Sequence, residues 1–393
     1  MLHHDWATLV AIAAALWLVV PLGGYWCVLR LVSVLRRARP VTRGYSEPVT
    51  VVIAAYNEER NVGRCLQSLA ASVPEPRIQR IIIADDGSTD GTIALAQGFA
   101  TANPSIDVLI LQNGRLGKNA TLGRAFPYVE TDVAILTDAD IIFEPNTLSR
   151  LVDAMADESV AIVVGRTIRP KRHADGGSEG EAVHQRVISS TAMMESQISS
   201  TILSNGHAYA VRREFLESYP NNAVSDDFYL NLRAINRGYR VVFASEACVQ
   251  EIRENTLQSE YDRTRRTIGA GVNAILQNAR LLWSLHRWES WFLYGHRVAR
   301  YLSPVALIVF LGALAVMATS STLWLVMFGI VVGALLAGMV GAWLEFNNRS
   351  MWFLRFPAYY LMMNLAAAVA MLQVVVGVRF DQWRPSVPSQ EKP

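Results

Sequence analysis

Two aspartates separated by one residue, Asp138 and Asp140, are the side chains of this chain best placed to do chemistry. They directly follow Val133–Thr137, a short apolar run that is typical of a buried parallel strand. Ligands of open α/β sheets bind at the carboxyl edge of the strands, so both carboxylates are expected at a binding edge. There they could hold a hard divalent cation, Mg²⁺ or Mn²⁺, which takes oxygen ligands and could bridge to a diphosphate. Since many strands end in polar residues, this interpretation depends on the motifs around the pair.

Two of those motifs also follow apolar runs and should reach the same edge. Ala54–Glu59 ends the run Val49–Ala55 and opens a helix, which delivers Tyr56 and Glu58 to the edge. The turn around Asp86 is acidic and flanked by glycine. Its carboxylates suit the imide and hydroxyl donors of a nucleoside better than phosphates, which they would repel.

Two further motifs supply a cation and a carboxylate pair. Lys118, after Gly117, offers one ammonium as a point-charge contact for a phosphate. Asp226 and Asp227 stand at the start of a helical segment, a suitable position for a general base.

Between about residues 48 and 280 the chain alternates strand-like and helical runs. This alternation predicts an α/β domain with a mostly parallel, Rossmann-like sheet. Lys171–Glu181 is rich in glycine and charge and predicts a mobile loop. The expected runs are the strands Val49–Ala55, Arg80–Ala84, Val108–Gln112, Val133–Thr137 and Val160–Gly165, and the helices Arg60–Ala71 and Thr92–Ala102.

The rest of the chain has the character of an integral membrane protein. Hydrophobic residues make up 51% of the 393 residues, and the mean hydropathy is +0.21. Each uncharged run is long enough to cross a hydrocarbon core about 30 Å thick. The runs are 6–29, 302–321, 322–344 and 356–378. They predict an N-terminal transmembrane helix within 1–30 and three more within 302–380, followed by a polar tail, 381–393.

Charge sets the expected orientation. Five arginines between positions 30 and 43 follow the first run, so the positive-inside rule places the α/β domain in the cytoplasm, under the plasma (inner) membrane. Residues 281–301 mix Trp, Tyr, His and Arg and predict an interfacial amphipathic helix against membrane lipids. The net charge of +2 implies no nucleic-acid partner, and three scattered cysteines form no metal or disulfide pattern.

This order of motifs resembles the membrane-embedded family 2 glycosyltransferases of GT-A fold, such as the cellulose, chitin, hyaluronan and poly-N-acetylglucosamine synthases. The resemblance implies that Tyr56 and Glu58 belong to the opening strand motif. It also implies that Asp86 binds the uracil of a UDP-sugar. Asp138 and Asp140 match the family's DxD motif, in which the second carboxylate holds Mg²⁺ or Mn²⁺.

The acceptor side follows from the same resemblance. Asp227, in the pattern Asp-x-x-Leu, matches the catalytic base, with Asp226 in place of the common glutamate. Gly206 and His207 lie in a segment like the one that precedes this base. In the family's Gln-x-x-Arg-Trp element, Arg266 keeps the arginine that helps bind pyrophosphate, whereas Arg263 and Thr267 replace the Gln and Trp. Losing the indole removes a stacking surface for sugar and argues against long-chain synthesis.

The implied reaction is an inverting transfer in which Asp227 takes the proton of the acceptor hydroxyl while the diphosphate leaves. A growing glycan, as in exopolysaccharide synthesis, is the acceptor this interpretation puts first. Transfer of one sugar to a lipid, such as ceramide or polyprenyl phosphate, is the alternative. A third hypothesis is that the protein is a catalytically silent membrane scaffold or a transporter. The full carboxylate set argues against the scaffold, and the lack of charge within the spans argues against the transporter.

Overall fold

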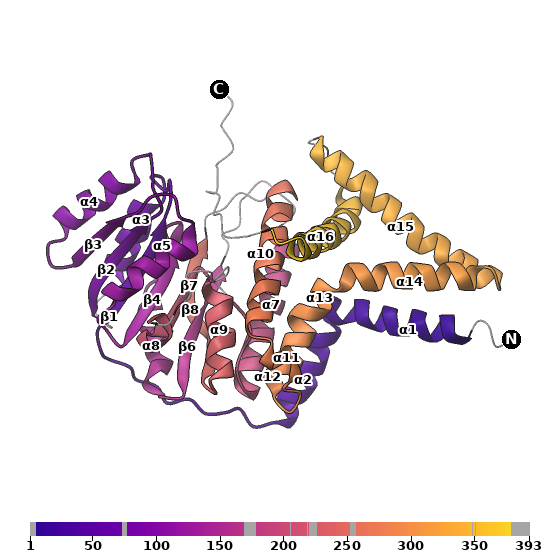
Figure 1. Ribbon diagram of the computed structural model, residues 1–393, viewed down its shortest axis with the longest axis horizontal. Coiled ribbons are helices and arrows are strands. Elements are labelled where there is room, and N and C mark those ends of the chain that lie inside the picture. The colour runs from indigo at the N-terminus through magenta and orange to yellow at the C-terminus, as the bar shows by residue number, and fades with distance from the viewer. Residues whose placement is uncertain are drawn as a thin grey trace. The chain divides into compact units, whose positions relative to one another are not determined.

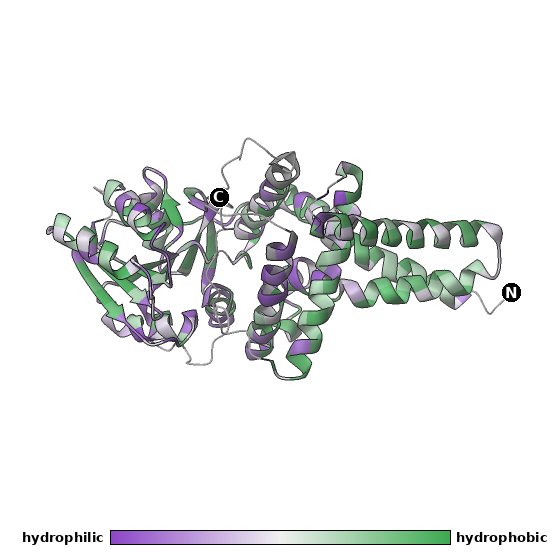
Figure 2. Ribbon diagram, turned by 90° about the horizontal axis from the view of Figure 1, so that it is seen from above, coloured by the Kyte–Doolittle hydropathy of each residue, from purple (hydrophilic) through white to green (hydrophobic). Residues whose placement is uncertain are grey.

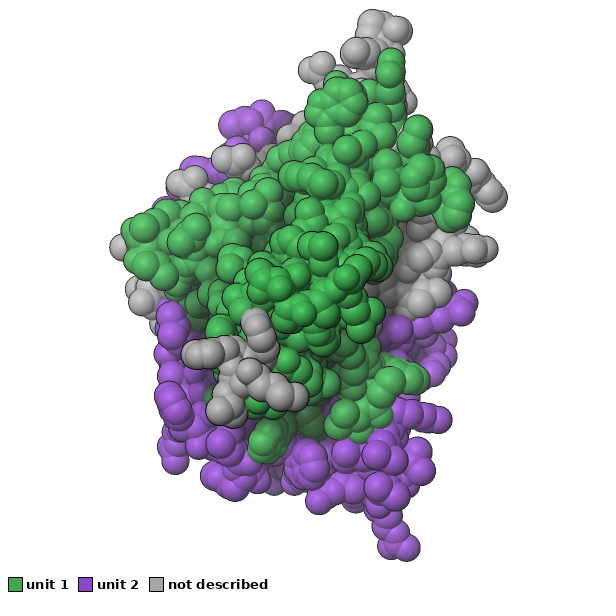
Figure 3. All heavy atoms as spheres, turned by 90° about the vertical axis from the view of Figure 1, so that its right-hand side faces the viewer, with its two compact units in different colours: residues 1–28, 255–273, 291–380 green, residues 29–254, 274–290, 381–393 purple. Residues whose placement is uncertain are grey.

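The computed structural model describes residues 5–72, 77–168, 178–204, 206–217, 219, 226–251, 257–347, 349 and 351–378. The chain divides into two compact units, coloured separately in Figure 3. The apolar unit comprises residues 1–28, 255–273 and 291–380. The α/β unit comprises 29–254, 274–290 and 381–393.

An eight-stranded sheet forms the centre of the α/β unit (Figure 1), in the order β3-β2-β1-β4-β7-β6-β8-β5. Parallel pairing joins β1 to β2 and β4, β2 to β3, and β6 to β8. The pairs β4–β7, β6–β7 and β5–β8 are antiparallel. The strands are β1 (Val49–Ala55), β2 (Ile78–Asp85), β3 (Asp107–Gln112), β4 (Val133–Asp138), β5 (Ile141–Phe143), β6 (Val160–Ile168), β7 (Ala208–Arg212) and β8 (Arg240–Glu251).

Helices pack against this sheet and make its central strands the core. Every residue of β1 is buried, as expected for a continuous apolar run covered on both faces. The helices of this unit are α3 (Val62–Ala71), α4 (Thr92–Ala102), α5 (Lys118–Ala125), α6 (Thr147–Val152), α7 (Ser178–Ile198), α8 (Arg213–Leu216), α9 (Asp226–Asn236) and α11 (Arg280–Trp283), with the short 3₁₀ turns Phe126–Tyr128 and Asp153–Ala156.

The α/β class and the mostly parallel sheet are confirmed. The predicted bounds of β1 and α4 match the structure, while β5, β7 and β8 were not predicted. Helix α7 begins at Ser178, inside the predicted loop Lys171–Glu181, whose residues 171–177 lie outside the described part. The predicted tail 381–393 also lies outside it.

The apolar unit is helical, and its hydrophobic colouring is evident in Figure 2. Within the described residues, α15 and α16 are long and apolar enough to cross a bilayer. Helix α14 would count as a third only with the preceding segment Trp288–Tyr301, from which it is bent by 65°. The helices are α1 (Asp5–Val19), α2 (Tyr25–Leu35), α10 (Leu257–Gln277), α12 (Trp288–Leu293), α13 (Ala299–Tyr301), α14 (Ser303–Ala318), α15 (Thr322–Phe346) and α16 (Trp352–Val375), and α2, α10 and α12 each run from one unit into the other.

Two predicted helices are interrupted. The run 6–29 is broken between α1 and α2 by a π-helical turn, Val20–Gly24, in which Gly23 has φ 147°. Residues 281–301 form α11, α12, a π-helical turn (Tyr294–Val298) and α13 instead of one interfacial helix. Gly and Pro in the first break, and the largely polar segment 284–287 (Ser-Leu-His-Arg) in the second, explain why the helix does not continue. The four-span count therefore remains a prediction.

Glycines allow α15 and α16 to approach closely. A Cβ at Gly338 would lie 2.8 Å from the Pro357 oxygen, and one at Gly341 would lie 2.8 Å from the Leu354 oxygen. Small residues at a crossing bring helix backbones together, which is how apolar helices associate where the hydrophobic effect is weak.

Candidate active site

Strand register brings the three sequence motifs side by side. Ala55 of β1 is paired with Asp85 of β2, and Ala54 is paired with Asp138 of β4. The backbone continues this pairing past the strand ends, because the Asp86 N–H donates to the Ala55 oxygen at 2.9 Å. The carboxyl ends of β1, β2 and β4 thus meet at one edge, as the sequence predicts.

The loop after β1 is locked to the turn after β2. Asn57, which has φ 53°, donates its N–H to Ser88 Oγ at 2.9 Å, and its Oδ1 accepts from Thr89 N at 2.8 Å. The Glu58 N–H donates to Thr92 Oγ1 at 2.8 Å. These contacts hold the loop that carries Tyr56 in a single conformation at the edge.

Glu58 is buried, with 4% of its surface exposed. The pKa of its carboxyl is raised to about 7, mainly by burial. The hydrogen bond from Asn61 lowers this pKa, whereas the charges of Asp140 and Asp138 contribute to the increase. Glu58 therefore lies close to the aspartate pair, and its protonation state changes near neutral pH.

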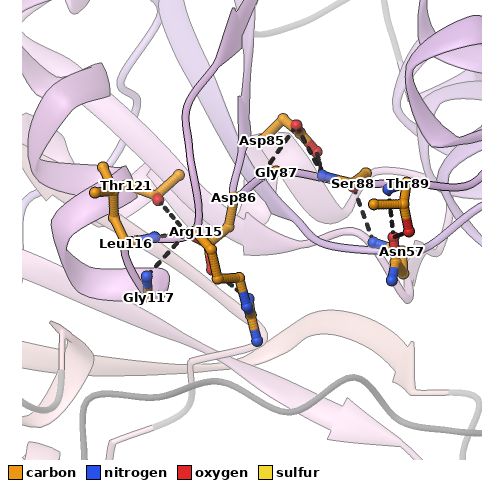
Figure 4. A network of polar contacts seen from close by, with 10 residues as sticks. All are labelled: Asn57, Asp85, Asp86, Gly87, Ser88, Thr89, Arg115, Leu116, Gly117 and Thr121. Atoms are coloured by element: carbon orange, nitrogen blue, oxygen red, sulfur yellow. Dashed lines mark hydrogen bonds and ion pairs between the residues drawn. The ribbon is translucent and has the colours of Figure 1, made fainter.

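Hydrogen-bond donors from residues 115–121 surround the Asp86 carboxylate (Figure 4). Its Oδ1 accepts from Leu116 N, Gly117 N and Thr121 Oγ1, each at 2.8 Å. Its Oδ2 is paired with the Arg115 guanidinium. The carboxylate is 1% exposed and organises residues 115–117, a task that the sequence interpretation did not assign to it.

The neighbouring Asp85 serves its own turn, since it accepts from Gly87 N at 3.1 Å and from Ser88 N at 3.1 Å (Figure 4). Arg115 then lies over the Tyr56 ring, with its Cζ 3.5 Å from the ring centroid. Arg115 thus links the buried Asp86 carboxylate to the Tyr56 ring.

Lys118 lies between the aspartate pair that follows β4 and the carboxylates of α9. Its Nζ lies 2.6 Å from Asp138 Oδ1 and 3.7 Å from Asp226 Oδ2. Burial lowers the pKa of Lys118, but Asp138, Asp226 and Asp227 together raise it above its ordinary value. The ammonium is thus held charged among carboxylates that come from β4 and α9.

The two aspartates of α9 occupy different surroundings. Asp226 is buried and accepts from the Tyr209 hydroxyl at 3.0 Å, which makes it a structural partner of β7 and Lys118. Asp227 Oδ1 accepts from Phe228 N at 2.8 Å at the start of α9. A Cβ added to Gly206 would lie 3.5 Å from Asp227 Oδ2 and 3.7 Å from Lys118 Nζ, so the absent side chain leaves room beside both groups.

Asp140 has the properties of a cation ligand. Its Oδ1 is buried and has no hydrogen-bond partner among the residues that the structure describes. Burial and, to a smaller extent, the charge of Asp138 together raise the pKa of its carboxyl to about 6. A divalent cation would stabilise the ionised form that burial disfavours, and carboxylate oxygens are the donors that Mg²⁺ and Mn²⁺ accept. Across the described parts of the chain, no three acidic, Cys or His groups already surround a common point.

Comparison with known proteins shows the family of this chain. The profile of glycosyl transferase family 2 matches residues 50–219. Polyprenol monophosphomannose synthase of Mycolicibacterium smegmatis is 31% identical over 216 residues, which are 52% of this chain and 78% of that protein. The chain belongs to glycosyl transferase family 2.

Other relatives of this glycosyltransferase match over shorter shares. Glycosyltransferase AglE of Haloferax volcanii is 27% identical over 203 residues, 50% of this chain and 64% of that protein. The undecaprenyl-phosphate 4-deoxy-4-formamido-L-arabinose transferase of Klebsiella pneumoniae is 34% identical over 125 residues, 32% of this chain and 37% of its own length. The chain thus spans less than two thirds of these two relatives.

A solved structure has the same fold. Mannosyltransferase PcManGT from Pyrobaculum calidifontis, solved in complex with GDP-Man and Mn²⁺, superposes with a TM-score of 0.70 over 94% of this chain and 99% of that one, at 20% identity. This likeness establishes the GT-A-like fold of the glycosyltransferase.

Two predicted site residues belong to the apolar unit. Arg263 and Arg266 lie on α10, where Arg263 Nη2 is 2.6 Å from Glu260 Oε2. Their roles beside pyrophosphate and acceptor therefore stay predictions.

Sequence reasoning missed several residues of this glycosyltransferase site. Arg115, Thr121 and Tyr209 act through side-chain contacts that no motif announces. His207 was assigned to the acceptor side, but its ring lies between Thr167 and Glu251, with Nδ1 2.9 Å from Thr167 Oγ1. Only a correct strand register could have indicated Glu251.

Proposed function

We propose that this enzyme transfers a single sugar, with inversion, from a nucleotide-sugar to a lipid acceptor of the polyprenyl-phosphate type at a membrane. The names of the relatives support a lipid acceptor over the growing glycan that the sequence interpretation put first. Helices α15 and α16, which are apolar enough to lie in a bilayer, are consistent with an acceptor that stays in the membrane. The proposal also places the α/β unit on the cytoplasmic side of the plasma membrane.

The observation that carries the proposal is the position of Lys118. One half-buried ammonium touches the first carboxylate of the aspartate pair and faces the carboxylates of α9. A diphosphate bound at the sheet edge would meet this charge, and positive charge fixed there stabilises a leaving group that gains negative charge.

Arg115 would contact the donor's base, and the buried Asp86 would position it. The Arg115 side chain is 41% exposed, is paired with Asp86 Oδ2 and lies over the Tyr56 ring, and its guanidinium donates hydrogen bonds. Uracil and guanine each present a carbonyl oxygen that could accept from this guanidinium, whereas adenine presents none. The donor in this proposal is therefore a UDP-sugar or a GDP-sugar, with the base against the Arg115–Tyr56 stack.

Asp140, with Asp138, would hold the divalent cation, which supplies Lewis-acid stabilisation of the diphosphate when bound. Asp138 also holds Lys118 in place. Asp227 would stand beside the attacking oxygen, in the space left by Gly206. An acceptor hydroxyl needs Asp227 to take its proton, whereas a phosphate monoester, with a second pKa of about 6, is already ionised near neutral pH.

The test is a product analysis with purified full-length enzyme in detergent. Radiolabelled UDP- and GDP-sugars are supplied with and without a short-chain polyprenyl phosphate, in Mn²⁺ or EDTA. We expect one labelled, lipid-soluble product that requires both the acceptor and the metal. A ladder or polymer would restore glycan synthesis as the function, and absence of transfer across the donor panel would refute the proposal. The control variant is Glu246→Gln, whose side chain on β8 is exposed, and it should retain the activity of the parent enzyme.

A further inference from the structure

Two groups, His207 and the buried Glu251, lie close to the aspartate pair, and no motif predicts Glu251. In the β4–β7 pairing, Thr137 faces Ala208, so His207 directly precedes β7 beside Asp138. In the β5–β8 pairing, Ile141 faces Glu251, which sets Glu251 beside the residue that follows Asp140. The register thus brings residues 70 and more positions apart in sequence to either side of one turn.

Glu251 and His207 also contact each other. His207 Nε2 lies 3.4 Å from Glu251 Oε1, and the Thr137 hydroxyl donates to the His207 carbonyl oxygen at 2.6 Å. Thr167 on β6 holds the other ring nitrogen. Glu251 is 4% exposed, so its carboxylate lies in the interior of the α/β unit. Both ring nitrogens of His207 and its carbonyl oxygen therefore have partners, and Nε2 is the nitrogen that contacts Glu251.

Carboxylates outnumber cations around this turn. Asp138 and Glu251 disfavour the ionised form of Asp140, whereas His207 and Lys118 favour it. Glu58 lies in the same field. A buried carboxylate oxygen without a partner, Asp140 Oδ1, faces this field. Burying so many carboxylates costs free energy that a divalent cation would offset.

We propose that Glu251 is a further residue of the cation site, acting together with Asp140, and that His207 is the positioning residue that holds Glu251. The proposal rests on the metal-dependent transfer proposed above but concerns cation binding itself. Carboxylate oxygens are ligands of choice for Mg²⁺ and Mn²⁺, and groups that orient a ligand change metal affinity about 10–100-fold when removed. The cation would draw together carboxylates that repel one another in its absence.

The test measures binding of Mn²⁺ alone to the purified full-length protein, from the electron paramagnetic resonance signal of the free ion. Glu251→Gln keeps the shape of the side chain and removes its charge. We expect Glu251→Gln to weaken Mn²⁺ binding about tenfold or more. Glu246→Gln, on the same strand but exposed, is the matched control and should change the affinity less than twofold. Equal affinities in these two variants would overturn the proposal.

A double-mutant cycle tests the positioning role of His207. If His207 acts by holding Glu251, His207→Gln weakens Mn²⁺ binding in the parent protein but adds little in the Glu251→Gln background. Additive losses would refute the positioning role. Glu251→Asp, which retains the charge, should recover most of the affinity, and failure to recover would reduce Glu251 to a packing residue.

Binding and transfer can fail separately. A protein that binds Mn²⁺ through Glu251 but transfers no sugar to a lipid phosphate would contradict the proposed function only. An enzyme that makes the lipid-linked product and whose Mn²⁺ affinity is indifferent to Glu251 would contradict this inference only.

Discussion

Replacing Asp140 with asparagine should make the metal-free protein more stable near neutral pH. Burial and Asp138 raise the pKa of the Asp140 carboxyl from 3.8 to about 6. A carboxyl whose pKa is raised by folding stabilises the folded state below its unfolded pKa and loses that contribution as pH rises through its folded pKa. In EDTA, this contribution is therefore present at pH 4 and lost between about pH 4 and pH 6.

The difference between 3.8 and about 6 corresponds to an upper bound of about 3 kcal/mol. For a domain of this size, about 1 kcal/mol moves the thermal midpoint by about 2–4 °C. Asparagine keeps the shape of the side chain and does not ionise, so Asp140→Asn should exceed the parent protein's midpoint by several degrees at pH 7.5 and match it near pH 4.

The assay is thermal unfolding of the full chain in detergent, in EDTA and in Mn²⁺, across that pH range. The difference between variant and parent is the measured quantity, because other groups titrate in both proteins alike. Mn²⁺ should raise the parent's midpoint at pH 7.5 and leave that of Asp140→Asn nearly unchanged. A variant that is no more stable than the parent in EDTA at pH 7.5 would refute the reasoning about this buried charge.

Three further substitutions test other parts of the structure. Lys118→Met leaves carboxylates facing one another in a partly buried site, so the free energy of unfolding should fall by about 1–3 kcal/mol, with Lys118→Arg milder; an unchanged thermal midpoint contradicts this pairing. Asp227→Asn should slow transfer to a hydroxyl acceptor by at least about 100-fold but transfer to a phosphate acceptor far less, and equal losses in initial rate argue against its role as base. Gly338→Ala should lower the thermal midpoint because its Cβ meets the Pro357 oxygen at 2.8 Å, whereas Gly333→Ala, with open space around it, is the control.

The sequence predicted the parallel half of the sheet well because each strand there is a continuous buried run. Val49–Ala55 is apolar apart from one threonine and is buried throughout, so its bounds could be predicted directly. Strands β5, β7 and β8 were missed, because β5 has three residues and β8 carries several polar ones. Their existence depends on partner strands far away in the chain, which a local pattern does not contain.

The same limit applies to the site. The edge position of Asp86 and Asp138 followed from the strands that they end. The partners of Asp86, however, come from a loop some 30 residues later, so the sequence did not indicate that its carboxylate is already occupied. Glu251 remained hidden for a related reason, since it reaches the aspartate pair only through the register of β8 against β5.

The close crossing of α15 and α16 constrains how the chain is threaded through a bilayer. Gly338 approaches Pro357, and Gly341 approaches Leu354, so the two helices run in opposite directions. A hairpin of two crossing helices returns the chain to the leaflet from which it started. The residues before Thr322 and those after Val375 would then emerge on the same face, and a reporter at either position would give the same answer about sidedness.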